Sequence, residues 1–258
     1  MTEVQSFSTS AEAAGAQGAI LGGGTLLMRQ VNEAPQTVPR LIRITDPALR
    51  EIRPEGDGHL IGAGVAMAQV IAHPDLGALA PVARSIGGPA LRNMASIGGN
   101  LFAPHPYGDF TVALLALEAQ VLWSDGQREE IERFLSVRDT ARGVVTGIWV
   151  PRIAPGALRY RKVSRTRPKG VSVMSIAAYL PNGGSAPRIA FGAMGPTPLR
   201  AKAAESALQG RGLTEESVTA AGAVCLQGLS PADDALASAW YRSEVAPVHL
   251  RRCLMGET

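Results

Sequence analysis

Cysteine and aromatic residues are scarce in this sequence. Cys225 and Cys253 are the only cysteines among 258 residues, and aromatic residues make up 5% of the chain. Two thiols cannot provide the four cysteine ligands of an iron–sulfur cluster or of an all-cysteine zinc site, and they cannot form a disulfide framework. We therefore predict that the chain holds no metal and that both cysteines are reduced.

The sequence also lacks long apolar runs. No uninterrupted apolar stretch reaches the roughly 18–20 residues needed to cross a bilayer. The amino terminus shows no basic region followed by an apolar one, which a secretory signal would have. With 46% hydrophobic and 18% charged residues, the composition is that of a globular protein. We expect a cytoplasmic protein that folds as one large domain or two modest ones.

Acidic residues are missing from one long internal stretch. None occurs between Asp139 and Glu205, although the net charge of the whole chain is only +3. Such a stretch is expected to attract an anion, either a ligand phosphate, an acidic partner protein or nucleic acid, and a solvated basic face is the alternative. The basic residues of this window are Arg142, Arg152, Arg159, Arg161, Lys162, Arg165, Arg167, Lys169, Arg188, Arg200 and Lys202.

Hydrophobic patterning changes near residue 155. Before this point, short strands and short helices are mixed without the regular alternation of a doubly wound sheet. The sequence also contains no Gly-x-Gly-x-x-Gly, so a Rossmann nicotinamide site is not expected. Beyond residue 155, a strand meander followed by helices predicts an α+β unit with a three-stranded antiparallel sheet. The predicted strands are 158–164, 173–180 and 188–194, and Asn182-Gly183-Gly184 joins the last two.

A triple glycine stands between a predicted strand and a predicted helix. Gly22, Gly23 and Gly24 follow the strand at 19–21, and Thr25 precedes the helix. Consecutive glycines let backbone amides approach a phosphate without a Cβ in the way, and a helix start adds unpaired N–H groups. A tight turn that binds nothing explains the same residues, so the triple glycine alone leaves both interpretations open.

A second glycine-rich segment lies between residues 87 and 100 and is predicted to be a loop. Its centre, Ser96-Ile97-Gly98-Gly99-Asn100, offers a hydroxyl, two glycines and an amide that could satisfy several phosphate oxygens. The alternative is a plain connection in which Asn100 takes a left-handed conformation. Asp109 follows nearby and is predicted to cap a helix at 111–117.

These segments fall in one order along the chain, and that order resembles a known family. The amino-terminal pieces are Leu21-Gly22-Gly23-Gly24-Thr25, Ile61-Gly62-Ala63-Gly64-Val65, Leu91-Arg92-Asn93, Ser96-Ile97-Gly98-Gly99-Asn100-Leu101 and Asp109. The carboxy-terminal pieces are 160–165, 188–201, Tyr241-Arg242 and 248–252. Together they resemble the FAD-binding (medium) subunit of the molybdenum hydroxylases, the xanthine dehydrogenase and carbon monoxide dehydrogenase family.

The resemblance implies both a domain organisation and a cofactor site. It implies a two-part FAD-binding domain of the vanillyl-alcohol-oxidase-like (PCMH) type at 1–155, split near 47–55. A domain like the carboxy-terminal domain of the carbon monoxide dehydrogenase flavoprotein would follow at 156–258. FAD would bind non-covalently, with Tyr160 beside the isoalloxazine. The implied cofactor-binding residues are Leu21, Gly22, Gly23, Gly24, Thr25, Leu26, Ser96, Ile97, Gly98, Gly99, Asn100, Asp109, Tyr160 and Lys162.

The resemblance also implies partners and a place in electron transfer. Hydroxylation would occur at a molybdenum cofactor in a large subunit, so no residue of this chain is expected to be catalytic at the oxidised carbon. Electrons would pass through two [2Fe–2S] clusters of a small subunit to the FAD held here, and then to an external acceptor. The expected assembly is a dimer of heterotrimers. The alternatives are a stand-alone FAD oxidoreductase of the same fold and a basic nucleic-acid-binding module.

Two departures from the family pattern give further expectations. Leu26 stands where the family usually has a small polar or acidic residue. The first glycine loop begins only about twenty residues into the chain, so the first strand of the family fold is expected to be missing or replaced.

Overall fold

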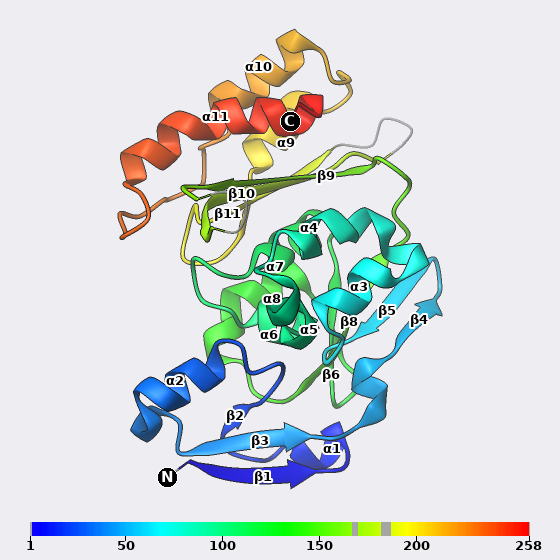
Figure 1. The fold of residues 1–258 in the computed structure, drawn as a ribbon. Helices are drawn as coiled ribbons and strands as arrows, with labels where there is room; N and C mark the ends of the chain where they lie inside the picture. The colour runs from blue at the N-terminus through cyan, green and yellow to red at the C-terminus, as the bar shows by residue number, and fades with distance from the viewer. Residues whose placement is uncertain (1, 167–169, 182–186, 258) are drawn as a thin grey trace.

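The computed structural model describes residues 2–166, 170–181 and 187–257, and the strands in these ranges form three sheets. Figure 1 shows the amino-terminal sheet at the bottom, a central group of helices beside a second sheet, and the carboxy-terminal sheet and helices at the top. Among the described helices, none is both long and apolar enough to cross a membrane.

The amino-terminal sheet has three strands. β1 (Glu3–Phe7) and β2 (Ala19–Ile20) both pair in parallel with the central β3 (Arg40–Ile44). Helices α1 (Ser10–Ala13) and α2 (Leu27–Glu33) lie in the connections. The expectation of a missing or replaced first strand is wrong, because β1 pairs with β3 along its whole length. A five-residue strand is short enough to fit before the first glycine loop.

The second sheet has five antiparallel strands in the order β4-β5-β8-β6-β7. Its strands are β4 (Ile52–Glu55), β5 (Gly58–Gly62), β6 (Gln120–Trp123), β7 (Arg128–Glu130) and β8 (Val145–Pro151). The helices beside it are α3 (Met67–Ala72), α4 (Ala80–Arg84), α5 (Pro89–Met94), α6 (Ile97–Leu101), α7 (Asp109–Ala116) and α8 (Ile131–Val137). All residues of α7 are buried, so this helix is the centre of the main hydrophobic core.

The 3-10 helices occupy the connections. They are η1 (Pro35–Thr37), η2 (Pro47–Arg50), η3 (Pro74–Leu79) and η4 (Arg138–Thr140).

The segment from 87 to 101 is largely helical, so its prediction as a loop is wrong. Gly98 and Gly99 lie inside α6, and Ser96 caps that helix by accepting a hydrogen bond from the Gly99 amide. A Cβ at Gly98 would lie only 2.9 Å from the Cβ of Ala63, so this glycine permits close packing rather than a turn. The capping prediction for Asp109 is also wrong: Gly108, with φ 95°, is the N-cap of α7.

The carboxy-terminal sheet has four antiparallel strands in the order β12-β11-β10-β9, not the three that the sequence predicts. The fourth strand was missed because it has only two residues, which pair with Ala190 and Phe191. The predicted turn at Asn182-Gly183-Gly184 lies outside the described residues. The strands are β9 (Leu158–Ser164), β10 (Ser172–Tyr179), β11 (Arg188–Gly192) and β12 (Leu199–Arg200).

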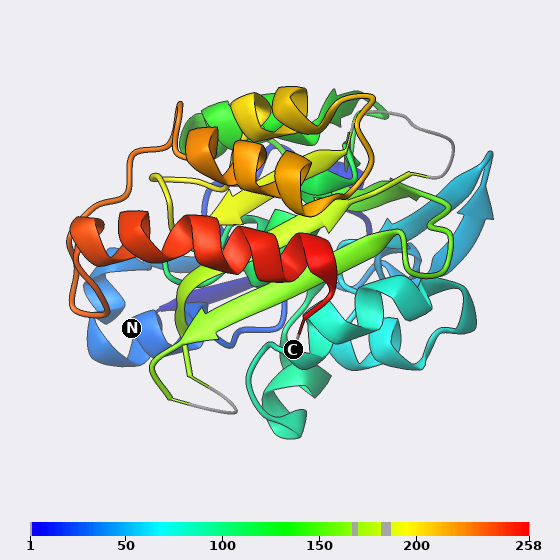
Figure 2. The ribbon, with the colours of Figure 1, turned by 90° about the horizontal axis from the view of Figure 1, so that it is seen from above.

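Three helices cover one face of this sheet, and α7 packs against the other. Seen from above, α9 (Lys202–Leu208), α10 (Glu215–Val224) and α11 (Ala239–Met255) lie over the strands (Figure 2). The opposite face contacts α7 through β10 and β11. The second core, under the helices, includes Met174, Phe191 and Leu250.

Acidic residues from other segments pair with much of the acid-free window. Arg188 and Arg200 both bind Glu118, just after α7, at 2.7 and 2.9 Å. Arg200 also forms a bidentate pair with Glu205 at 2.6 and 2.7 Å, and Glu205 accepts a hydrogen bond from the Ile189 amide. Arg188 and Arg200 are therefore ion-paired within the fold, and Arg167 and Lys169 of this window lie outside the described residues.

We predict that Glu205→Ala lowers the free energy of unfolding by about 3 kcal/mol, because it leaves the Arg200 guanidinium, 9% exposed, without its closest partner. The melting temperature should fall by roughly 6–12 °C, measurable by calorimetry. The control is Glu132→Ala, which breaks an exposed pair with Lys202 and should cost less than about 1 kcal/mol. Equal losses in the two variants would contradict the prediction.

Candidate functional site

A large cleft opens between the amino-terminal sheet and the helices beside the five-stranded sheet. Its volume is about 1550 Å³. One side is lined by α1, β2, α2 and the loop between the last two. The other side is lined by α5, α6, the start of α7 and parts of β9 and β10. Both glycine-rich segments therefore meet at one cleft, although more than seventy residues separate them.

The first glycine loop follows β2, and most of its backbone amides are free. Gly23 packs so closely that a Cβ there would lie 1.7 Å from the carbonyl oxygen of Met94, which only glycine allows. In the part of the chain that the structure describes, the amides of Gly22, Gly24, Thr25 and Leu26 have no protein acceptor. Leu26 occupies the N-cap position of α2 and offers no side-chain cap. The loop therefore presents a group of free N–H donors beside the cleft.

Ser96 joins the two glycine-rich segments. Its Oγ accepts hydrogen bonds from the amides of Gly23, at 3.3 Å, and of Gly99, at 3.2 Å. The side chain of Ile97 is fully buried in the main core, so this residue can reach a ligand only through its backbone. Asn100 lines the cleft and lies within α6, which excludes the left-handed alternative. Its Oδ1 accepts a hydrogen bond from the Thr111 amide at 3.1 Å.

An ion pair between Asp109 and Lys162 stands at the wall of the cleft. The Lys162 Nζ and Asp109 Oδ2 atoms are 2.9 Å apart, and the side chains are 15% and 9% exposed. Asp109 Oδ1 also accepts a hydrogen bond from Ser172 Oγ at 2.6 Å. Lys162 donates to the carbonyl oxygen of Ser85 at 3.1 Å. These contacts hold a positive charge in a fixed place beside the cleft.

Tyr160 lies on the same strand as Lys162 but is not among the residues that line the cleft. Its ring is half-buried against the main core, and its hydroxyl lies 3.4 Å from Ser85 Oγ, whose own proton is donated to the Val82 carbonyl oxygen at 2.7 Å. Burial, followed by the nearby Asp109 carboxylate, raises the pKa of Tyr160 well above its ordinary value. The phenol therefore stays protonated.

An apolar rim around the cleft was not predicted from the sequence. Leu91, Met94, Phe102 and Tyr107 all line it, and each is at least 40% exposed. Large exposed apolar side chains around a cleft indicate a binding site, and contact with a flat ring system is more favourable for them than contact with water. Arg29, Arg50 and Arg142 also line the cleft and were not predicted as site residues. Only the fold brings these separate segments together, so periodicity and motifs could not reveal them.

The cysteines lie away from the cleft, in the carboxy-terminal core. Burial raises the pKa of Cys225 to about 11 and that of Cys253 to about 12, so both thiols stay protonated. Within the described ranges, no three histidine, cysteine or acidic side chains group together as metal ligands would.

Two known protein families match this chain, one over its amino-terminal part and one over its carboxy-terminal part. Residues 2–153 match the family described as the FAD binding domain in molybdopterin dehydrogenase. Residues 160–256 match the CO dehydrogenase flavoprotein C-terminal domain.

Individual relatives match nearly the whole chain. The carbon monoxide dehydrogenase medium chain of Hydrogenophaga pseudoflava is 30% identical over 93% of this chain and 89% of its own length. The putative xanthine dehydrogenase FAD-binding subunit of Escherichia coli is 29% identical over 91% of this chain and 85% of its own. A solved structure of the H. pseudoflava carbon monoxide dehydrogenase superposes with a TM-score of 0.87 at 28% identity, covering 98% of this chain and 96% of that one. Because the first family match alone spans more than half of its length, the chain belongs to the FAD-binding medium subunits of the molybdenum hydroxylases, a family of oxidoreductases.

Proposed function

We propose that this chain binds one FAD non-covalently in the cleft and passes electrons from an iron–sulfur partner to an external acceptor. The observation that carries the proposal is the meeting of the two glycine-rich segments, with free amides, beside a fixed Lys162. The proposed domains are 1–155, in two parts split near 47–55, and 156–258. The family matches at 2–153 and 160–256 support this division.

The first glycine loop fits the pyrophosphate of FAD. Its amides without protein acceptors, at Gly22, Gly24, Thr25 and Leu26, are the donors that phosphate oxygens require. Ser96 holds this loop against α6 through Gly23 and Gly99. The cleft, at about 1550 Å³, exceeds the volume of roughly 300–1000 Å³ typical of sites for smaller ligands, as an extended dinucleotide requires.

The wall of the cleft around Lys162 fits the flavin. Bound FAD would supply the redox chemistry, while the chain provides binding, orientation and electrostatics. Lys162 places a positive charge at this wall, and Asp109 holds the ammonium group in place. A positive charge near the flavin ring favours the reduced flavin, because this form carries more negative charge than the oxidised one. Tyr160 supports this wall from behind through Ser85.

The proposed partners are a small iron–sulfur subunit and a large molybdenum subunit, in a dimer of heterotrimers. Two relatives are named as medium chains of carbon monoxide dehydrogenase, which supports a place between other subunits. The nucleic-acid alternative would use the basic segment 159–169. In the described part of that segment, Lys162 pairs with Asp109 and Arg159 donates to the Leu254 carbonyl oxygen, which counts against this alternative.

The first test is the flavin content of the purified chain. Denaturation should release FAD at close to one per chain, identified by its visible spectrum and mass. The chain co-expressed with both partner subunits is the control, because a site that depends on them would retain FAD only there. Absence of FAD from both preparations would refute the proposal. For electron transfer, a small subunit reduced with dithionite and freed of excess reductant should bleach the flavin band on mixing.

We predict that Ser96→Ala weakens FAD binding by roughly 5–30-fold, because a lost cap of this kind costs about 1–2 kcal/mol and frees the first loop. Fluorescence titration of the flavin-free chain measures the affinity. Thr214→Ala is the matched control: Thr214 caps α10, in the carboxy-terminal domain, through the Ser217 amide. Its affinity for FAD should equal that of the unmodified chain, and a matching loss in this control would contradict the assigned role of Ser96.

We predict that Lys162→Met lowers the two-electron midpoint potential of bound FAD by about 30 mV or more, which corresponds to about 1.4 kcal/mol. The substitution removes a positive charge and leaves the Asp109 carboxylate unpaired beside the cleft. Spectroelectrochemistry measures the potential. Lys202→Met, which makes the same charge change at an exposed pair, should leave it unchanged. The double variant Asp109→Asn/Lys162→Met should recover part of the shift, and an unaltered potential in Lys162→Met would exclude this role.

A further inference from the structure

Four consecutive backbone carbonyls at the end of α4 accept hydrogen bonds from two cationic side chains. They belong to Arg84, Ser85, Ile86 and Gly87, and we call this segment the carbonyl turn. Arg92 Nη1 donates to the first, third and fourth of these oxygens, at 3.2, 3.2 and 2.5 Å. Lys162 Nζ donates to the second, that of Ser85, at 3.1 Å. Arg92 therefore holds the carbonyls on both sides of the one that Lys162 uses.

The position of the carbonyl turn explains why it takes cationic donors. The last carbonyls of a helix lack partners within the helix, and basic side chains both satisfy them and interact favourably with the helix dipole. Gly87 has φ 48°, and a Cβ there would lie 2.9 Å from Cδ2 of Leu91, so the turn also packs closely against α5. The turn is thus shaped by its contacts with α5 and its arginine.

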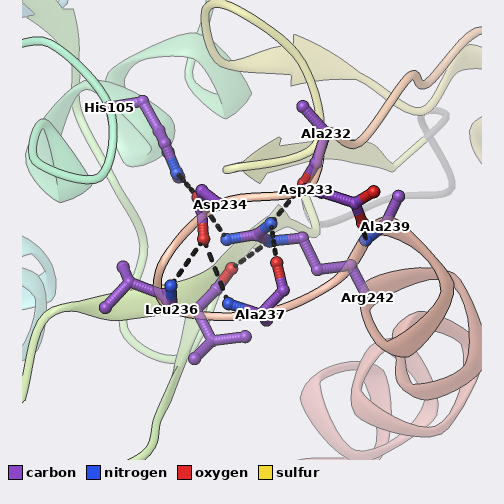
Figure 3. Close-up of polar contacts among 9 residues, drawn as sticks. His105, Ala232, Asp233, Asp234, Leu236, Ala237, Ala239 and Arg242 are labelled. Carbon is purple, nitrogen blue, oxygen red and sulfur yellow. Dashed lines mark hydrogen bonds and ion pairs between the residues drawn. The ribbon is translucent and has the colours of Figure 1, made fainter.

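Arg242 shows a similar use of an arginine in the carboxy-terminal domain. Its Nη1 donates to the carbonyl oxygens of Ala232 and Ala237, at 2.5 and 2.9 Å, and so holds the loop before α11 (Figure 3). There the carboxylate of Asp234 neutralises the guanidinium at 2.7 Å. Arg92 has no carboxylate partner among the residues that the structure describes. Replacing Arg92 therefore leaves no carboxylate unpaired.

The helix α5, which carries Arg92, also contacts the first glycine loop. A Cβ at Gly23 would lie 1.7 Å from the carbonyl oxygen of Met94, the last residue of α5. At the start of the helix, the Arg92 amide donates to the Gly88 carbonyl at 3.0 Å. The position of Arg92 is therefore fixed by contacts that do not involve Lys162.

We propose that Arg92 is a positioning residue, which fixes the Lys162 ammonium group at the wall of the cleft by holding the carbonyl turn in place. Without the guanidinium, the three carbonyls that it binds turn toward water, and the Ser85 carbonyl between them moves away from Lys162 Nζ. Lys162 then keeps its pair with Asp109 but loses its second contact. The effect on bound FAD rests on the proposed function, whereas the fixing of Lys162 does not.

The first test measures the accessibility of the Lys162 ammonium group in the flavin-free chain. The sequence has three lysines, Lys162, Lys169 and Lys202, so reductive methylation followed by mass spectrometry of peptides reports each one separately. Arg92→Gln should raise the methylation rate of Lys162 several-fold relative to the exposed Lys202, measured well below the melting temperature. An unchanged Lys162 rate in the folded variant would overturn the proposal.

Two variants serve as controls for this test. Arg84→Gln removes a positive charge from the carbonyl turn but keeps its carbonyl, and Glu205→Ala weakens the fold at a separate ion pair. The Lys162 rate should be unchanged in both, and an equal increase in either one would overturn the proposal. Arg92→Lys is the second test variant, for the case that Arg92→Gln does not fold. One ammonium group cannot span three carbonyls as the guanidinium does, so a Lys162 rate equal to that of the unmodified chain would also overturn the proposal.

The effect on the cofactor is measured as the midpoint potential of the FAD-loaded chain. Arg92→Gln should lower this potential, as Lys162→Met does, but by less, because Lys162 is still present. Added to Lys162→Met, the same substitution should cause no further shift, because Arg92 acts through Lys162. An equal shift in both backgrounds would overturn this role, since it would come from the charge of Arg92 itself. If the chain binds no FAD, the proposed function fails, whereas the methylation rates still decide whether Arg92 fixes Lys162.

Discussion

The buried ion pair of Asp109 and Lys162 is the contact on which the cleft and the domain interface both depend. Desolvating two charges is costly, and a buried pair is tolerated only when further hydrogen bonds satisfy both groups. Ser172 and the Ser85 carbonyl provide those bonds, one from each domain. Because removing either partner would leave a buried charge, the pair fixes how β9 and β10 sit on α7. The position of the positive charge beside the cleft is therefore set by the packing of the two domains.

Ser96 is a second contact that joins separate segments at the cleft. It accepts hydrogen bonds from both glycine-rich segments, one following β2 and the other in α6. The close approach of Gly23 to the Met94 carbonyl shows that no side chain fits between them. Here the glycines serve contact between protein segments as well as access to a ligand. This double use explains why a triple glycine considered alone could not be assigned to either purpose.

The sequence predicted most strands and both glycine segments, but it did not predict how they meet. Hairpins and strands such as β9 follow from local alternation, and turn residues mark their ends. The helix α6 was missed because two glycines in five residues are atypical of a helix, and a packing constraint at Gly98 explains their presence. β12 was missed because two residues carry no periodicity. The Asp109–Lys162 contact and the apolar rim come from segments far apart in sequence, and only the fold could reveal them.

The helix α7 has a consequence for how the chain folds. All eight of its residues are buried, and its core extends across the domain boundary to Ala177 and Ala190 of the carboxy-terminal sheet. A cut near residue 155 would expose the face of that sheet that α7 covers, and it would strip α7 of half its surroundings. The two family matches therefore meet at an interface that contributes residues to the main core. Neither half is expected to be a stable protein when expressed without the other.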